Sequence, residues 1–166
     1  MTDQERIDGL LRHITAVREN CSILAEKLMA KGEGELARRL LQNAQVHDAS
    51  KFSGIEWDYL TTGNEAKGNG LKLAIDHHRR NNPHHPEYWS HGIVEMPLVY
   101  EYELIADLCA RSNEMGTSVR DYVTNEIPKK YNVPKNGDLH KELLDILDML
   151  VNKPFEQLVE EPKVNI

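Results

Sequence analysis

Five of the eight histidines in this chain fall within fifteen residues, between positions 77 and 91. Histidine is the commonest metal ligand in proteins and the usual acid–base group near neutral pH, so this density predicts metal binding or proton transfer. Groups with the same chemistry also occur outside the cluster. The candidates are His77, His78, His84, His85 and His91 within it, and His13, His47, Asp48 and Asp107 elsewhere.

The elements that position these residues are predicted to be helices, because apolar residues recur every three or four positions almost throughout and no convincing strand appears. Helices are expected at about residues 4–29, 35–46, 71–81, 97–112, 119–127 and 139–151. Ser53-Gly-Ile-Glu56 has the form of a capping box that opens a short helix. We expect a loop at 61–70 and irregular backbone at 81–91. The sequence thus predicts an all-α domain of six or seven helices over residues 1–158, with a tail at 159–166.

Several candidate ligands fall on the apolar faces of these helices. His13, His78 and Asp107 continue the apolar stripes of their helices, and His47-Asp48 continue the core-facing side of the second. A single buried histidine usually finds an ordinary hydrogen-bond partner, but an unpaired buried carboxylate costs several kcal/mol. One or two divalent cations would satisfy all five groups together. We therefore expect a metal centre.

The order of these groups resembles the HD-domain superfamily of metal-dependent phosphohydrolases, which are helical bundles. Its signature is a His, a later His-Asp pair and a distal Asp, which match His13, His47-Asp48 and Asp107. The local sequence is also similar, with an apolar approach to His-Asp-x-x-Lys that ends at Lys51. The wider pattern, with its later histidines, resembles a small group of HD-like proteins common in bacteriophage genomes. The resemblance covers about residues 10–115.

The resemblance implies one or two transition-metal ions, such as Mn, Fe, Co or Zn. His13, His47, Asp48 and Asp107 would hold the first ion, and Asp48 would bridge to a second. Members with two ions add histidines between the His-Asp pair and the last Asp. Helical phasing favours His78 for that role, joined by one or both of His84 and His85, but the letters alone do not decide among these and His77.

Two such ions would activate water as hydroxide and clamp a phosphoryl group during in-line displacement. Lys51 would neutralise charge on the phosphoryl oxygens, although an ordinary salt-bridged lysine explains it equally well. A histidine that is not a ligand, His77 or His84, could protonate the leaving oxygen, and His77 is our candidate catalytic acid. The predicted function is hydrolysis of a small phosphate ester, with a nucleotide as the leading substrate.

Substrate-binding candidates lie next to the proposed ligands. Arg79 could steer an anionic substrate, although adjacent basic residues more often form a solvated helix face. A nucleobase could stack on Trp89, although such rings more commonly pack in the core. The predicted capping box explains Glu56, which therefore receives no chemical role. His91 and His140 lie outside the pattern of predicted ligands and receive none either.

Two other functions are open. A histidine-rich site also suits a di-iron centre that oxidises a substrate with oxygen, as in some HD-like proteins. Alternatively, one cation only stabilises a helical interaction module. Structural zinc sites are usually rich in cysteine, and neither Cys21 nor Cys109 lies near the cluster, so this alternative ranks last.

Composition sets the remaining expectations. A length of 166 residues fits one domain, and the longest apolar runs are far shorter than the ~20 residues of a membrane-spanning helix. The polar start indicates no secretory leader, and two cysteines in helical patterns favour reduced thiols. A net charge of −7 disfavours binding to a nucleic acid polymer. We expect a cytoplasmic protein of a bacterial cell or phage-infected host, without membrane contact, that acts on a small phosphorylated molecule.

Overall fold

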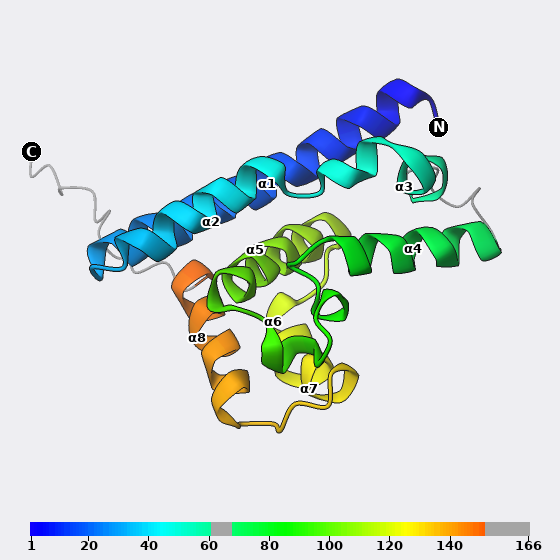
Figure 1. Ribbon diagram of the computed structural model, residues 1–166. Helices are drawn as coiled ribbons and strands as arrows, with labels where there is room; N and C mark the ends of the chain where they lie inside the picture. Colours follow the sequence, from blue (N-terminus) through cyan, green and yellow to red (C-terminus); the bar gives the residue numbers. More distant parts are fainter. Residues whose placement is uncertain (61–67, 152–166) are drawn as a thin grey trace, which may run out of the picture.

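The computed structural model describes residues 1–60 and 68–151, and these residues form helices and connecting turns without a strand (Figure 1). The long helix α1 (Asp3–Ala30) packs beside α2 (Gly34–Val46), and α5 (Leu98–Met115) packs against both. Helix α8 (Asp138–Val151) covers one end of α5, whereas α3 (Gly54–Tyr59) and α4 (Asn69–Asn81) pair at the other end. The predicted all-α single domain is confirmed.

The core lies where α1, α2, α5 and α8 meet, and it is built from the apolar stripes seen in the sequence. Leu24 on α1, Leu40 on α2, Ile105 on α5 and Leu147 on α8 are fully buried there. Truncating one such leucine to alanine would cost roughly 2–5 kcal/mol. Cys21 and Cys109 are buried free thiols in the same core. This core fixes α1 and α5, two of the three helices that carry predicted ligands.

The long helices match their predicted positions to within a few residues, and α1 begins at a capping box between Thr2 and Glu5. The segment at 81–91 is largely irregular as expected, with short 3-10 turns η3 (Pro86–Tyr88) and η4 (Gly92–Glu95) before α5. The predicted tail and most of the predicted loop at 61–70 lie outside the described residues, although Asn69 and Gly70 belong to α4. No described helix is long and apolar enough to cross a bilayer.

The helix predicted at 119–127 differs from the structure. It consists of α6 (Val119–Asp121), a π-helical turn η5 (Tyr122–Glu126) and α7 (Ile127–Lys130). Pro128 explains the change, because proline has no N–H for the carbonyl four residues earlier and its ring would clash with that carbonyl. His140 lies 3.0 Å from the Val123 carbonyl through Nε2, so it is a satisfied core histidine, as expected.

The predicted capping box at Ser53–Glu56 does not form. Ser53 is the N-cap of α3, but its side chain makes no capping hydrogen bond. Glu56 is fully buried, so its carboxylate must find strong partners inside the protein. It finds them in Ser50 Oγ at 2.8 Å and in the rings of His77 and His78. These contacts tie α3 to α4.

Candidate metal centre

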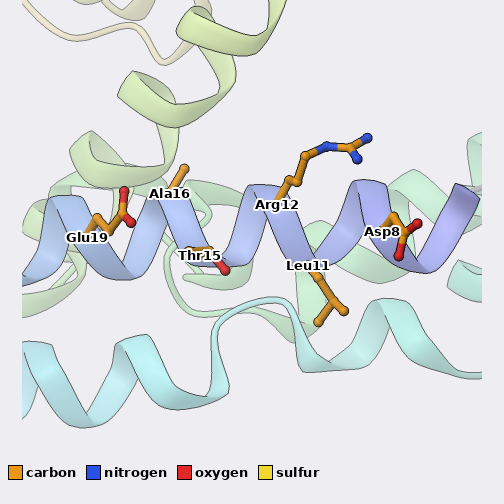
Figure 2. A pocket seen from close by; sticks show the side chains of 6 residues that line it. All are labelled: Asp8, Leu11, Arg12, Thr15, Ala16 and Glu19. Carbon is orange, nitrogen blue, oxygen red and sulfur yellow. The ribbon is translucent and has the colours of Figure 1, made fainter.

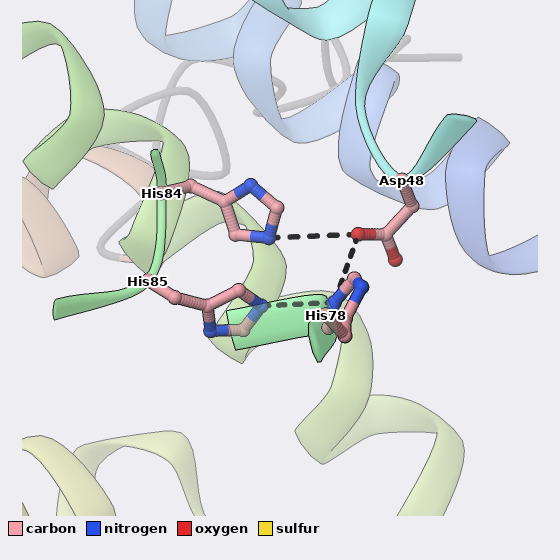
Figure 3. A group of neighbouring side chains, drawn as sticks. All are labelled: Asp48, His78, His84 and His85. Carbon is pink, nitrogen blue, oxygen red and sulfur yellow. Dashed lines mark hydrogen bonds and ion pairs between the residues drawn. The ribbon is translucent and has the colours of Figure 1, made fainter. Parts of the chain in front are cut away.

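The seven predicted ligands converge from distant parts of the described chain, between residues 13 and 107. α1, α4 and α5 each supply one of them, and two turns supply the others: the turn after α2 and the segment after α4. Their ligand atoms form two groups, each with all atoms within 4.8 Å of one another. The first group is His13, His47 and Asp107, and the second, shown in Figure 3, is Asp48, His78, His84 and His85.

The turn that carries His47 and Asp48 is not the helical continuation predicted from the sequence. α2 ends at Val46, and Asp48 has left-handed backbone torsions, with φ of 56° and ψ of 17°. Aspartate tolerates this conformation better than most residues because its short side chain is polar. The chain then enters the 3-10 turn η1 (Ala49–Phe52), which returns Lys51 to Asp48. In a continuous helix, His47 and Asp48 would diverge by about 100°, whereas here both face the centre.

The two carboxylate oxygens of Asp48 face different histidines. Oδ2 lies 3.5 Å from Nε2 of His13 and 3.6 Å from Nε2 of His47. Oδ1 lies 3.4 Å from Nε2 of His78 and 3.5 Å from Nε2 of His84. The Asp48 side chain is almost fully buried, so it lies between two pairs of imidazole nitrogens rather than in solvent.

Asp107 and His85 complete the arrangement. Asp107 Oδ1 lies 3.0 Å from Nε2 of His13, and Oδ2 lies 3.8 Å from Nε2 of His84. His85 turns its Nε2 toward Nε2 of His78, at 3.0 Å (Figure 3). The imidazole nitrogens that face the centre are therefore all Nε2 atoms.

Buried polar atoms without partners test whether these residues fit a metal ion. Asp48 Oδ1 and the Nε2 atoms of His47 and His84 make no hydrogen bond with a described residue. Leaving such atoms unsatisfied costs about 1–3 kcal/mol each, and these three atoms lie together at the centre. Imidazole and carboxylate ligands in this combination suit divalent transition metals. The cluster could therefore hold a metal ion.

Carboxylates behind the histidines fix their ring orientation. Nδ1 of His47 lies 2.9 Å from Glu103, Nδ1 of His13 lies 2.7 Å from Glu114, and Nδ1 of His78 lies 2.8 Å from Glu56. Metal-binding histidines typically use one ring nitrogen for such a contact while the other binds the ion. This outer layer leaves each Nε2 free to face the centre.

Sequence reasoning missed this outer layer. Glu103 precedes Asp107 by four residues and Glu114 follows it by seven, so all three share one face of α5. An acidic residue at each of these helical spacings from a predicted ligand was a usable signal. Glu56 carried no comparable signal, because its place three residues after Ser53 matches an N-terminal cap.

The electrostatics of the metal-free centre keep its carboxylates ionised. Burial opposes ionisation, but the neighbouring imidazoles, with Lys51, hold the pKa of Asp48 well below its usual range, and His13 helps to lower that of Asp107. Burial also opposes protonation of His13, but Asp107 and Asp48 raise its pKa to about 9. In the metal-free centre, a proton on His13 and the Lys51 ammonium thus offset the two carboxylates, and a metal ion would have to replace the His13 proton.

The pKa values of His78 and His85 are lowered, in contrast to that of His13. Burial lowers the pKa of His78, and burial together with the nearby His84 and His78 rings lowers the pKa of His85 to about 2. Both rings are therefore neutral around pH 7. A neutral imidazole presents the lone pair that metal coordination requires.

The centre opens into a cavity of about 1010 Å³, lined by His13, His78, His85 and Asp107 among others. Lys51 also lines it, with Nζ 2.5 Å from Asp48 Oδ2. A bound ion would therefore be reachable from solvent. A smaller, open hollow of about 440 Å³ lies along α1 and contains no predicted ligand (Figure 2).

Two predicted residues lie away from the cavity. His77 is half-exposed and holds Glu56 through Nδ1 at 2.7 Å, so it supports α3 rather than facing the cavity. Trp89 donates from Nε1 to the Pro83 carbonyl and packs against Tyr88 and Tyr100. The structure thus gives no basis for a catalytic His77 or a substrate-stacking Trp89.

The chain matches the model of a family described as "Family of unknown function (DUF5662)" over residues 2–153. No curated protein and no solved structure shows a significant match. The matched range contains every ligand of the candidate centre. The chain therefore belongs to the DUF5662 family.

Proposed function

We propose that this protein is a metal-dependent phosphohydrolase that acts on a small phosphate ester at a dinuclear centre. The observation that carries the proposal is the position of Asp48, whose two oxygens each lie about equally far from two histidine nitrogens on opposite sides. A carboxylate in this position suits a bridging ligand. The resemblance to HD-domain phosphohydrolases supports the same assignment.

The ligands divide naturally between two ions. His13, His47 and Asp107 would hold one with Asp48 Oδ2, and the other would be held by Asp48 Oδ1 with His78, His84 and His85. Bound divalent ions of this kind supply an activated water and stabilise charge on phosphoryl oxygens. Mn, Fe, Co and Zn are all compatible with this donor set.

The chain's own residues favour an anionic substrate. Six basic and four acidic side chains line the cavity, whereas the whole sequence has 20 basic and 27 acidic residues. A locally basic cavity in an acidic protein attracts an anion to the centre. Lys51 lines this cavity beside Asp48, where its ammonium would stabilise charge that develops on a phosphoryl group.

The cavity also favours a catalytic over a purely structural metal site. Structural sites are closed by protein ligands, whereas catalytic sites keep a position open to substrate. Four predicted ligands line a cavity whose volume, about 1010 Å³, is that of a small-molecule pocket. A nucleotide fits a cavity of this size.

Metal loading tests the proposal directly. The protein would be stripped with a chelator, reloaded separately with Mn²⁺, Co²⁺, Zn²⁺ or anaerobic Fe²⁺, and assayed for phosphate release from nucleoside monophosphates and p-nitrophenyl phosphate. We expect release that depends on metal and is equal with and without oxygen. Oxygen-dependent turnover by the iron form alone would favour the di-iron oxygenase instead. No turnover, with metal removal unfolding the chain, would favour the structural module.

A further inference from the structure

A second group of polar side chains lines the same cavity beside the metal centre. Arg79 comes from α4, Tyr122 from η5, Lys130 from the end of α7, and Tyr131 follows directly. None of them is a candidate metal ligand. We call these four residues the basic–aromatic cluster.

The cluster has more positive charge than its own acidic partner neutralises. Arg79 Nη1 lies 3.7 Å and Lys130 Nζ lies 3.9 Å from the same oxygen of Glu87. Both distances exceed a hydrogen bond, and the other Glu87 oxygen is buried without a hydrogen-bond partner among the described residues. Glu87 is also absent from the cavity lining. Two cations thus face the cavity with one carboxylate behind them.

The surroundings of the cluster favour an incoming anion. Burial and the charge of Arg79 lower the pKa of Lys130, which means that the two cations repel each other in a partly dehydrated place. Burial raises the pKa of Tyr131 and that of Tyr122, so both phenols remain protonated donors. Lys130 Nζ lies 4.9 Å from the Tyr131 ring, which keeps the ammonium close to it. An anion bound here would relieve the repulsion.

Tyr122 lies in an uncommon backbone conformation, a π-helical turn. Tyr122 is the first residue of the π-helical turn, and His140 holds the carbonyl of the next residue, Val123. Such turns are rare and occur frequently at functional sites, because the extra residue redirects nearby side chains. Here the turn lies in the segment that supplies three of the four cluster residues.

We propose that the basic–aromatic cluster binds a second phosphate of the substrate, while the first phosphate reaches the metal centre. A phosphate brings up to two negative charges and three acceptor oxygens to two cations and two phenols. A carboxylate brings one charge and two oxygens and matches the cluster less well. The substrate class is thus a small molecule with two phosphates, and hydrolysis of the first phosphate rests on the proposed function.

Kinetics with one- and two-phosphate nucleotides test this inference in the manganese-loaded protein. The substrates are adenosine 5′-monophosphate, adenosine diphosphate and adenosine 3′,5′-bisphosphate. We expect kcat/KM for at least one two-phosphate substrate to exceed that for the monophosphate by about tenfold, a difference of roughly 1.4 kcal/mol. Arg79→Gln and Lys130→Gln should reduce this preference about tenfold, mainly by raising KM.

Each variant has a matched control at the adjacent position. Arg80 is exposed and pairs with Asp76, and Lys129 is exposed and pairs with Glu126. Neither lines the cavity. Arg80→Gln and Lys129→Gln remove the same charge from the same helices and should keep the preference. An equal loss in Lys129→Gln and Lys130→Gln would mean a general effect of charge and would overturn the proposal.

Calorimetric binding separates this inference from the proposed hydrolysis. If no nucleotide is hydrolysed, the same three nucleotides are titrated into the manganese-loaded protein. Tighter binding of a two-phosphate nucleotide that Arg79→Gln weakens would retain the second-phosphate site while the phosphohydrolase proposal fails. Equal affinity for one and two phosphates in the unmodified protein would overturn the second-phosphate site, as would an equal loss for all three nucleotides in Arg79→Gln.

Discussion

Oε1 of Glu103 lies 2.9 Å from Nδ1 of His47, and both side chains are almost completely buried. The same oxygen lies 3.4 Å from Nδ1 of His84. His47 belongs to the first group of candidate ligands and His84 to the second. Glu103 therefore orients one histidine from each group. The two imidazoles also hold the pKa of Glu103 down to about 2, despite its burial, so its charge is present at neutral pH.

Glu103→Gln should weaken metal binding without unfolding the domain. The change keeps the size of the side chain but removes the charge that fixes the two rings, and loss of such a contact typically costs 10–100-fold in affinity. Titration of the stripped protein with Zn²⁺ or Mn²⁺ measures the effect. Glu101→Gln, two residues earlier on α5, is the matched control and should bind as the unmodified protein does. Equal affinities in all three proteins would contradict a role for Glu103.

Asp48→Asn should reduce metal occupancy and remove phosphate release. Asparagine preserves the size of the side chain and tolerates the left-handed backbone at φ of 56°, whereas Asp48→Ala should give the same loss with added backbone strain. The amide offers one oxygen and no charge, so it cannot replace a bridging carboxylate. Elemental analysis after dialysis measures occupancy, and circular dichroism checks the fold. Unchanged occupancy would count against the bridging role.

Lys51→Met should keep the metal and lower turnover. The ammonium lies 2.5 Å from Asp48 and lines the cavity, so its loss removes one contact to a phosphoryl group but no ligand. We expect kcat to fall on the order of tenfold to a thousandfold, as for a lost transition-state contact. Steady-state kinetics and metal analysis on the same preparation decide the matter. Unaltered kinetics would make Lys51 an ordinary salt-bridged residue.

Glu101 should make the domain less stable as the pH rises. Burial, with the nearby charge of Glu142, raises the pKa of Glu101 to about 8, and one of its oxygens is buried without a hydrogen-bond partner among the described residues. A raised carboxyl pKa means that the folded state holds more protons than the unfolded state between pH 4.5 and 8. The free energy of unfolding therefore falls as the pH rises through this window.

Glu101→Gln should remove this part of the pH dependence. Above pH 8 we expect the variant to be more stable than the unmodified protein by roughly 1 kcal/mol or more, with little difference near pH 4.5. Urea unfolding of the metal-free proteins at several pH values measures this difference in the free energy of unfolding. Glu142→Gln should give a smaller change in the same direction. Parallel stability curves for Glu101→Gln and the unmodified protein would show that Glu101 ionises freely.

The sequence was sufficient for the features that depend on periodicity. The apolar stripes predicted the long helices, and the phase of His13 and His78 on those stripes predicted their burial. His84 and His85 lie in irregular backbone, where no periodicity fixes direction, so their convergence on Asp48 could only be seen in three dimensions. The same holds for Asp48, whose direction depends on one left-handed residue.

Predictions from local sequence patterns were wrong where a side chain has its partners elsewhere in the chain. Glu56 matched a capping box, but burial gave it two histidines about twenty residues away instead. His77 and Trp89 lie close to ligands in sequence, but the helix and the turn direct their side chains elsewhere. The π-helical turn at Tyr122 also escaped prediction, because its cause is a single proline in an otherwise helical pattern.

Anomalous X-ray scattering from crystals grown with Mn²⁺ tests the central claim most directly, because it locates each ion without reference to activity. We predict two peaks, one on each side of the Asp48 carboxylate, with His13, His47 and Asp107 around the first and His78, His84 and His85 around the second. A crystal of Asp48→Asn should lose at least one of them. A single peak, or no peak, at this centre in the unmodified protein would contradict the dinuclear centre.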